Sequence, residues 1–118
     1  VFTGYIDYKD MPSIYQLGNA AVLPSMWDEP AGMTMVEAVV SGLPLITTKS
    51  GGIPAYIPDN AAILLDRDEN LVENIRKSIM MIKSEPNKFE NMILNGRKLE
   101  QKYNLTDYYS NFESMLME

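Results

Sequence analysis

Four short runs of apolar residues constrain the fold of this chain more than any other feature. They occupy residues 1–4, 20–24, 43–48 and 61–65. Apolar and polar positions do not alternate within a run, which predicts strands that are buried on both faces. Between the first three runs lie segments whose apolar residues recur at helical spacing. This order of elements is typical of a parallel sheet flanked by helices, so we predict an α/β fold with about three to four strands.

The chain after residue 65 has a different pattern, that of amphipathic helices. Residues 68–84 begin with Asp68 as a suitable N-cap, and residues 87–103 and 106–118 repeat the pattern, the last with Thr106 as the cap. The residues expected to face the core are Leu71, Ile75, Ile79 and Ile82, then Phe89, Met92, Ile93, Gly96, Leu99 and Tyr103, and finally Tyr108, Phe112 and Met115. We expect these C-terminal helices to act as a scaffold.

Composition excludes several kinds of site. The chain contains no cysteine and no histidine, which rules out disulfides, thiolate metal sites, a cysteine nucleophile and a Ser-His-Asp triad. We expect no metal centre and no cofactor. A net charge of −6 argues against a nucleic-acid partner. No apolar run approaches the roughly 18 residues needed to span a membrane.

The start of the chain resembles the middle of a protein. It opens on a predicted strand and has no initiator Met. We therefore expect residues 1–118 to form a single domain that is a fragment of a longer protein.

The loop at residues 24–32 is the most informative part of the sequence. In a parallel sheet, ligands bind beyond the carboxyl ends of the strands, where the loops after Gly4, Pro24 and Thr47 meet. Glu29 lies on the middle loop, and Gly32 allows a ligand to approach the backbone closely. The free amides of the following helical turn, from Gly32 to Thr34, form with the helix dipole an anion site suited to phosphate. Lys49 and the pair Gly51-Gly52 can face the same crevice from the next loop.

Glu37 is a carboxylate whose neighbours in the sequence are almost all apolar. One turn into the predicted helix, it shares a face with Met33 and Ser41, and neither can neutralise it. Burying it is costly unless something hydrogen-bonds to it. Two interpretations remain open from chemistry alone. The hydroxyls of a sugar diol can satisfy it, or backbone amides or an Arg or Lys from elsewhere in the chain can do so.

A combined motif spans residues 24–57. It consists of Pro24-Ser25, Glu29 to Gly32, Glu37-Ala38, Gly42 to Pro44 and Gly51-Gly52. In this order and spacing, the motif resembles the signature of the retaining nucleotide-sugar glycosyltransferases of GT-B fold, specifically family 4. The two glutamates stand at that family's E-x7-E spacing, and the flanking segments agree with it as well.

The resemblance implies a role for each matched residue. Glu29 would act in catalysis by hydrogen-bonding hydroxyls of the donor sugar, and Glu37 would bind the ribose hydroxyls. Ala31, Gly32, Met33 and Thr34 would offer backbone amides to the sugar and the diphosphate. Tyr5 and Ile6 would lie near the nucleobase. The donor would be a UDP- or GDP-sugar, and the acceptor a glycan or lipid-linked glycan.

The resemblance also implies what the chain lacks. It would be the second half of a Rossmann-like, C-terminal donor-binding domain, without the N-terminal acceptor domain and without the Arg and Lys that the family uses for the diphosphate. Alone, it should be inactive and should expose a sheet edge, which favours self-association. The parent would lie in the cytoplasm or, through its other parts, at the membrane periphery. The alternatives are a nucleotide-sugar epimerase of similar shape and a non-catalytic nucleotide-binding or interaction module.

Overall fold

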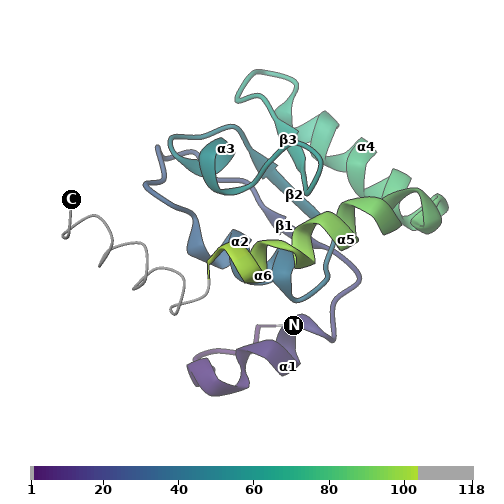
Figure 1. Ribbon diagram of the computed structural model, residues 1–118. Coiled ribbons are helices and arrows are strands. Elements are labelled where there is room, and N and C mark those ends of the chain that lie inside the picture. The colour runs from purple at the N-terminus through teal and green to yellow at the C-terminus, as the bar shows by residue number, and fades with distance from the viewer. Residues whose placement is uncertain (1, 104–118) are drawn as a thin grey trace, which may run out of the picture.

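A three-stranded parallel sheet forms the centre of the molecule (Figure 1). The computed structural model describes residues 2–103. Strands β1 (Ala21–Leu23), β2 (Leu45–Thr48) and β3 (Ile63–Leu65) lie in the order β1-β2-β3, and both pairs are parallel. The predicted α/β class and strand number are confirmed.

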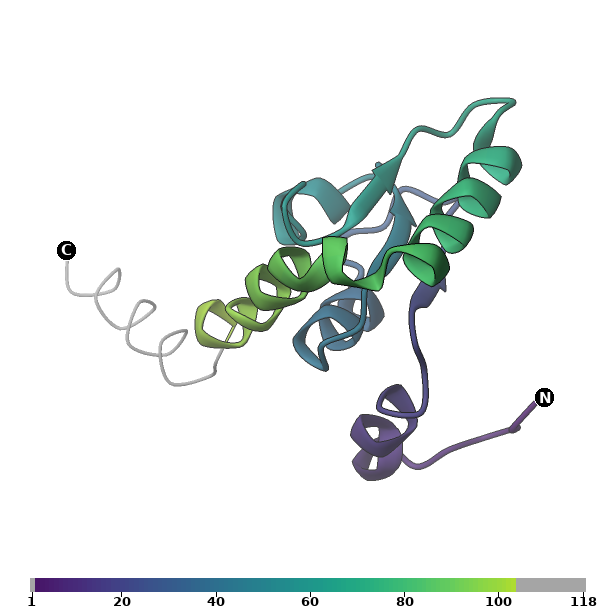
Figure 2. The same cartoon turned by 90° about the vertical axis from the view of Figure 1, so that its right-hand side faces the viewer.

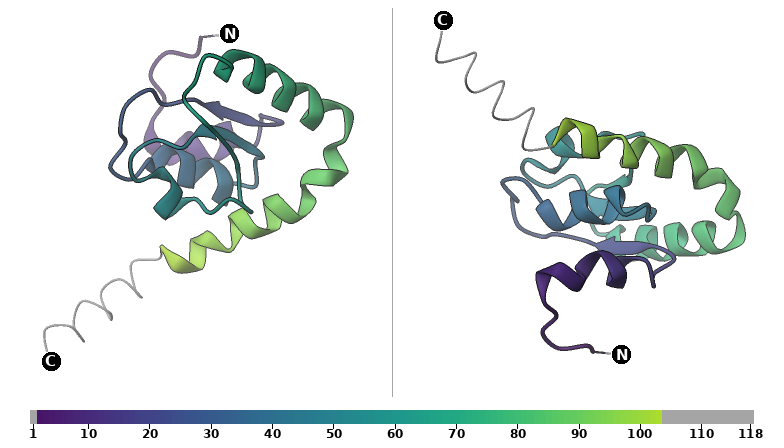
Figure 3. Two further views of the ribbon diagram at one scale, coloured as in Figure 1. Left: turned by 90° about the horizontal axis from the view of Figure 1, so that it is seen from above. Right: turned by 60° about the horizontal axis from the view of Figure 1, so that its bottom comes forward.

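Helices cover both faces of this sheet (Figures 2 and 3). One face packs against α2 (Met33–Val40), α3 (Ile53–Tyr56) and α6 (Leu99–Lys102). The other face packs against α4 (Leu71–Ser84) and the 3-10 helix η2 (Pro86–Phe89). Helix α5 (Glu90–Arg97) follows η2 and packs on α2, so the chain crosses from the second face to the first. Before the sheet come η1 (Tyr8–Asp10) and α1 (Met11–Tyr15).

The central strand is buried on both faces. Leu45 packs with the α2 side of the core, whereas Ile46 packs with the α4 side, because successive strand residues point to opposite faces. Both side chains are 0% exposed, and burial of such a side chain contributes about 1.5–3 kcal/mol. This two-sided burial is why the sequence at residues 43–48 is apolar without alternation.

The first apolar run does not form the predicted strand. Residues 2–7 have no regular secondary structure, and Phe2 is fully exposed. A strand needs a neighbour for its backbone amides and carbonyls, and no strand of the described residues pairs with this segment. Apolar content alone was therefore an insufficient signal here.

The predicted helical faces are largely confirmed. Leu71, Ile82, Phe89 and Leu99 are buried, but Ile79 is 42% exposed. The N-cap of α4 is Asn70 and not Asp68, whose carboxylate instead accepts the Asn70 amide at 2.9 Å. The predictions at residues 106–118 lie outside the described residues. Of the helices in residues 2–103, none is both long and apolar enough to cross a bilayer.

Candidate functional site

Three loops leave the carboxyl ends of the strands and meet at one edge of the sheet. They are residues 24–32 after β1, residues 49–52 after β2 and residues 66–70 after β3. The prediction that the loops after Pro24 and Thr47 share an edge is confirmed. The segment after Gly4 does not follow a strand, so the prediction that placed it at this edge on that ground was wrong.

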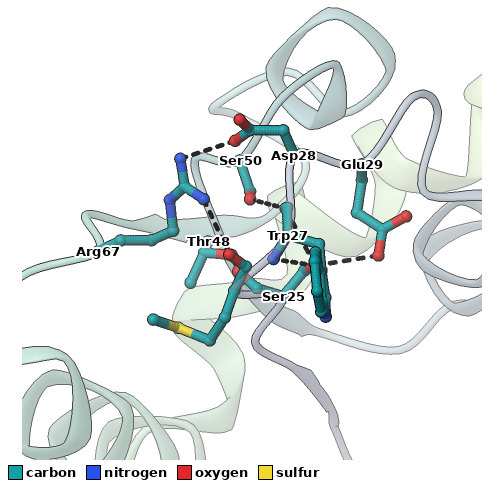
Figure 4. A network of polar contacts seen from close by, with 8 residues as sticks. Ser25, Trp27, Asp28, Glu29, Thr48, Ser50 and Arg67 are labelled. Atoms are coloured by element: carbon teal, nitrogen blue, oxygen red, sulfur yellow. Dashed lines mark hydrogen bonds and ion pairs between the residues drawn. The ribbon is translucent and has the colours of Figure 1, made fainter.

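The loop after β1 is fixed by side chains from β2 and the loop that follows it (Figure 4). The Thr48 hydroxyl donates to the Ser25 carbonyl at 2.6 Å, and the Ser50 hydroxyl donates to the Trp27 carbonyl. Both donors are 0% exposed. A buried hydroxyl without a partner is costly, so each of these side chains requires the loop backbone to lie where it does.

The Gly51-Gly52 pair lies against the same loop rather than facing an open crevice. Gly51 has a φ of +53°, and a Cβ there would lie 2.5 Å from the Glu29 carbonyl oxygen. A Cβ on Gly52 would collide with the Pro30 carbonyl. The Gly52 amide donates to the Glu29 carbonyl at 2.7 Å. The two glycines are therefore needed for the close backbone packing that holds residues 28–30.

Arg67 holds the loop from its other side, as Figure 4 shows. Its Nη1 donates to the Met26 carbonyl at 3.1 Å, and its Nη2 donates to Asp28 Oδ1 at 2.8 Å. Lys49, the other cation on these three loops, lies 3.4 Å from Asp66. Both cations at this edge are thus already paired with carboxylates.

Glu29 is half-buried, and its carboxylate is oriented by the loop itself. The Ser25 hydroxyl donates to Glu29 Oε1 at 3.0 Å. Its backbone is held by the Gly52 amide and by the Trp27 carbonyl, which accepts the Glu29 amide at 3.0 Å. The second carboxylate oxygen, Oε2, has no hydrogen bond among the described residues and can accept one from a ligand hydroxyl.

The amino end of α2 follows directly. Gly32 adopts a φ of +60° at the N-cap, and its carbonyl accepts the amides of Met35 and Val36. Within residues 2–103, the amides of Met33 and Thr34 meet no acceptor, as is usual for the first turn of a helix. Ala31 is half-buried, while Met33 and Thr34 are exposed. The amides of Met33 and Thr34 therefore have no partner among the described residues, whereas Gly32, which was also predicted as a donor, is buried.

Glu37 is satisfied by two tyrosines, which neither sequence interpretation named. Tyr8 donates its hydroxyl to Oε1 at 3.2 Å, and Tyr15 donates to Oε2 at 3.1 Å. Partial burial, together with the hydrogen bond to Glu37 and its charge, raises the pKa of Tyr15 to about 12. Tyr15 therefore remains a donor at neutral pH. Because a carboxylate offers about four acceptor positions, Glu37 retains capacity for further bonds.

A cavity adjoins this cluster. It has a volume of about 200 Å³ and lies between the η1–α1 segment and α2. Its lining residues are Tyr8, Met11, Pro12, Tyr15, Glu37, Val40 and Ser41.

Tyr5 and Ile6 lie just before this cluster. Tyr5 is 89% exposed and its hydroxyl is 3.4 Å from Asp7 Oδ1, while Ile6 is half-buried. The structure brings Glu29 together with Ala31, Gly32, Met33 and Thr34 on one loop and helix start. Sequence reasoning missed Ser50 and Arg67, which hold this arrangement, and it named Ser25 only as part of the motif, without its contact to Glu29. Their residue types gave no signal, because serine and arginine are ordinary loop residues.

A family model described as "Glycosyl transferases group 1" matches residues 1–99. The putative glycosyltransferase YtcC of Bacillus subtilis (strain 168) is 29% identical over 98 residues, which are 83% of this chain and 24% of that protein. The mannosylfructose-phosphate synthase of Agrobacterium fabrum is 44% identical over 52 residues, which are 44% of this chain and 11% of that protein. The matched part of the chain thus spans a quarter or less of the length of these curated relatives.

Solved structures resemble the fold over most of the chain. The sucrose-phosphate synthase of Thermosynechococcus elongatus matches with a TM-score of 0.81 and 27% identity, over 99% of this chain and 29% of that one. The C-terminal domain of the glycosyl transferase group 1 family protein LpcC from Francisella tularensis matches with a TM-score of 0.66 and 24% identity, over 86% of this chain and 52% of that one.

Proposed function

The chain belongs to the glycosyl transferases group 1 family, and from that premise we propose that it is the donor-binding part of a retaining transferase that uses a nucleotide-diphosphate sugar. The chain has the α/β fold of a GT-B C-terminal domain. The observation that carries the proposal is the juxtaposition at the amino end of α2. There the amides of Met33 and Thr34, which have no acceptor within residues 2–103, follow within five residues the oriented carboxylate of Glu29.

The amino end of α2 suits the diphosphate of such a donor, and Glu29 suits its sugar. Helix amides and the helix dipole favour the diphosphate, whose charge grows as the sugar leaves. The free oxygen of Glu29 suits hydroxyls of the transferred sugar. Since Lys49 and Arg67 are both paired, the cations that neutralise the diphosphate come from the rest of the longer protein.

Glu37 serves the ribose in this proposal. Tyr8 and Tyr15 orient its carboxylate, and the remaining acceptor positions bond the two ribose hydroxyls. Tyr5 and Ile6, on the preceding segment, lie near the base. UDP- and GDP-sugars are the donors to test, and the acceptor is a glycan or lipid-linked glycan bound by the N-terminal domain. The 118-residue chain alone transfers no sugar, and the longer protein acts in the cytoplasm or at the membrane periphery.

Two conservative substitutions in the full-length protein separate these roles. Glu37→Gln keeps the shape but changes charge-assisted hydrogen bonds into neutral ones, so affinity for the free nucleoside diphosphate should fall roughly 5- to 30-fold. Glu29→Gln should slow transfer and leave that affinity nearly unchanged, because its partner is the sugar. Calorimetry with the free diphosphate and a transfer assay measure the two effects.

The tyrosines supply the control. A double Tyr8→Phe, Tyr15→Phe variant removes the internal donors but leaves the Glu37 carboxylate, so it should bind the diphosphate better than Glu37→Gln does. If Glu37→Gln binds as tightly as wild type while Glu29→Gln does not, the two roles are wrongly assigned.

A further inference from the structure

One guanidinium holds the loop at residues 24–32 at two points, on either side of Trp27. Arg67 Nη1 bonds the Met26 carbonyl at 3.1 Å and Nη2 bonds Asp28 at 2.8 Å. Arg67 follows β3, about forty residues along the chain from its partners, so the contact joins the third strand end to the first. Glu29 comes next after Asp28. Residues 26–28 therefore connect Ser25, whose hydroxyl bonds the Glu29 carboxylate, to Glu29 itself.

This contact differs from an ordinary surface ion pair. Asp28 is 74% exposed, and pairs in such surroundings contribute little to stability. The side chain of Arg67 is 32% exposed, and its second hydrogen bond goes to backbone. A lysine can supply the charge, but its single nitrogen cannot reproduce a planar fork that reaches two acceptors.

Every residue from 25 to 29 is held in the same way. The Ser25, Met26, Trp27 and Glu29 carbonyls each accept a hydrogen bond from outside the loop, and Asp28 is held through its side chain. Thr48, Ser50 and Gly52 supply the contacts on the inner side, which adjoins β2. Arg67 is the residue that supplies both contacts on the outer side.

We propose that Arg67 is a positioning residue, which fixes residues 26–28 and thereby holds the Glu29 carboxylate in the geometry that sugar transfer requires. The catalytic consequence rests on the proposed function, but the effect on the loop does not. Trp27 gives a direct report on the loop because it is the one tryptophan of this chain, lies between the two residues that Arg67 holds and is 82% exposed.

The loop itself is read by fluorine NMR of full-length protein labelled with 5-fluorotryptophan. The Trp27 resonance is assigned by its loss in Trp27→Phe. In Arg67→Met we expect this resonance to narrow and to shift toward that of free fluorotryptophan, because the loop gains motion. Arg76→Met is the matched control, since Arg76 also forms a two-nitrogen pair, with Glu73 on the exposed side of α4, and should leave the resonance unchanged.

Sugar transfer by the same proteins gives the second readout. For Arg67→Met we expect kcat to fall roughly 10- to 100-fold, the range that misplaced catalytic groups produce. The KM for the donor should change by no more than about twofold, because the lost positioning acts in the transition state. Arg67→Lys should fall between wild type and Arg67→Met, and Arg76→Met should match wild type. The thermal midpoints of Arg67→Met and Arg76→Met should agree.

The NMR measurement and the transfer assay can each contradict the proposal independently. An unchanged Trp27 resonance in Arg67→Met overturns the positioning role, whatever the activity. A mobile loop with unchanged kcat also overturns it, since Glu29 would not then depend on Arg67. A thermal midpoint that falls well below that of Arg76→Met shows that Arg67 acts on global stability instead. If wild type transfers no sugar at all, the proposed function fails, and the resonance still decides whether Arg67 holds the loop.

Discussion

At the scale of single residues, Glu37 shows what sequence reasoning can and cannot reach. Its apolar neighbours correctly indicated that this carboxylate needs donors, because burial without them is costly. The donors themselves, Tyr8 and Tyr15, lie 29 and 22 residues earlier in the chain. No local pattern connects positions so far apart. Glu29 differs in this respect, since its Ser25 partner is only four residues away.

The Tyr15–Glu37 contact predicts a dependence on alkaline pH. The pKa of Tyr15 is raised to about 12 from its usual value near 10, so the folded chain holds this proton more tightly than the unfolded chain. The resulting stabilisation is fully present below about pH 10 and is lost as pH rises toward 12. Carbon-13 NMR of tyrosine-labelled protein, assigned with Tyr15→Phe, should show the Tyr15 ring titrating near pH 12.

Glu37→Gln should move that titration back toward 10. It removes the charge and weakens the hydrogen bond, although partial burial, the largest cause, remains. Arg76→Met, which lies on α4, should leave the titration where it is. A Tyr15 ring that titrates near pH 10 in wild type would show that neither the partial burial nor the Glu37 contact forms in solution.

At the scale of elements, the local sequence pattern was enough to predict the three strands and helix α2. The apolar runs at residues 20–24, 43–48 and 61–65 became β1, β2 and β3, and residues 33–40 became α2. The strand predicted at residues 1–4 was wrong because a strand also needs a pairing partner, and the amino-acid sequence of the segment does not show whether one exists. Gly51-Gly52 was visible as a pair, but its purpose became clear only with the backbone of residues 28–30 beside it.

The packing of Gly51 against residues 28–30 can be tested by comparing alanine substitutions at two glycines of similar backbone conformation. Gly51 and Gly4 have φ values of +53° and +70°, so alanine at either position is strained by about 1–2 kcal/mol. Only at Gly51 would the new Cβ also meet backbone atoms, those of Asp28 and Glu29, whereas Gly4 has nothing within 4 Å. We therefore expect Gly51→Ala to lower the free energy of unfolding by more than about 2 kcal/mol, and Gly4→Ala by less.

Urea unfolding of the two variants measures this difference. Gly51→Ala should also reduce transfer by the full-length protein, because Glu29 moves with the loop. Equal losses of stability in both variants would mean that conformational strain, and not packing against residues 28–30, explains the glycine.

At the scale of the whole molecule, helices cover the two faces of the sheet, but its two edge strands lack a second partner among the described strands. Helices cover both faces, as Figure 3 shows, yet β1 and β3 each pair with β2 alone among the described strands. Ala21 donates its amide to the Pro44 carbonyl at 2.9 Å, so by alternation the amide of Val22 points to the open side of β1. Val22 is 37% exposed. An edge of this kind is a template for another strand.

We accordingly expect the 118-residue chain in isolation to form dimers or larger species through β1. Light scattering at roughly tens of micromolar protein, where exposed strand edges begin to associate, measures this.

Val22→Lys places a charge on the edge and should shift the protein toward monomer, because a buried, unpaired ammonium is costly in a strand–strand contact. Val72→Lys is the matched control, since Val72 is 80% exposed on α4, away from the edge, and should leave association unchanged. A wild-type chain that stays monomeric would show that the edge of β1 is protected in solution. Association that persists in Val22→Lys would place the contact on another surface.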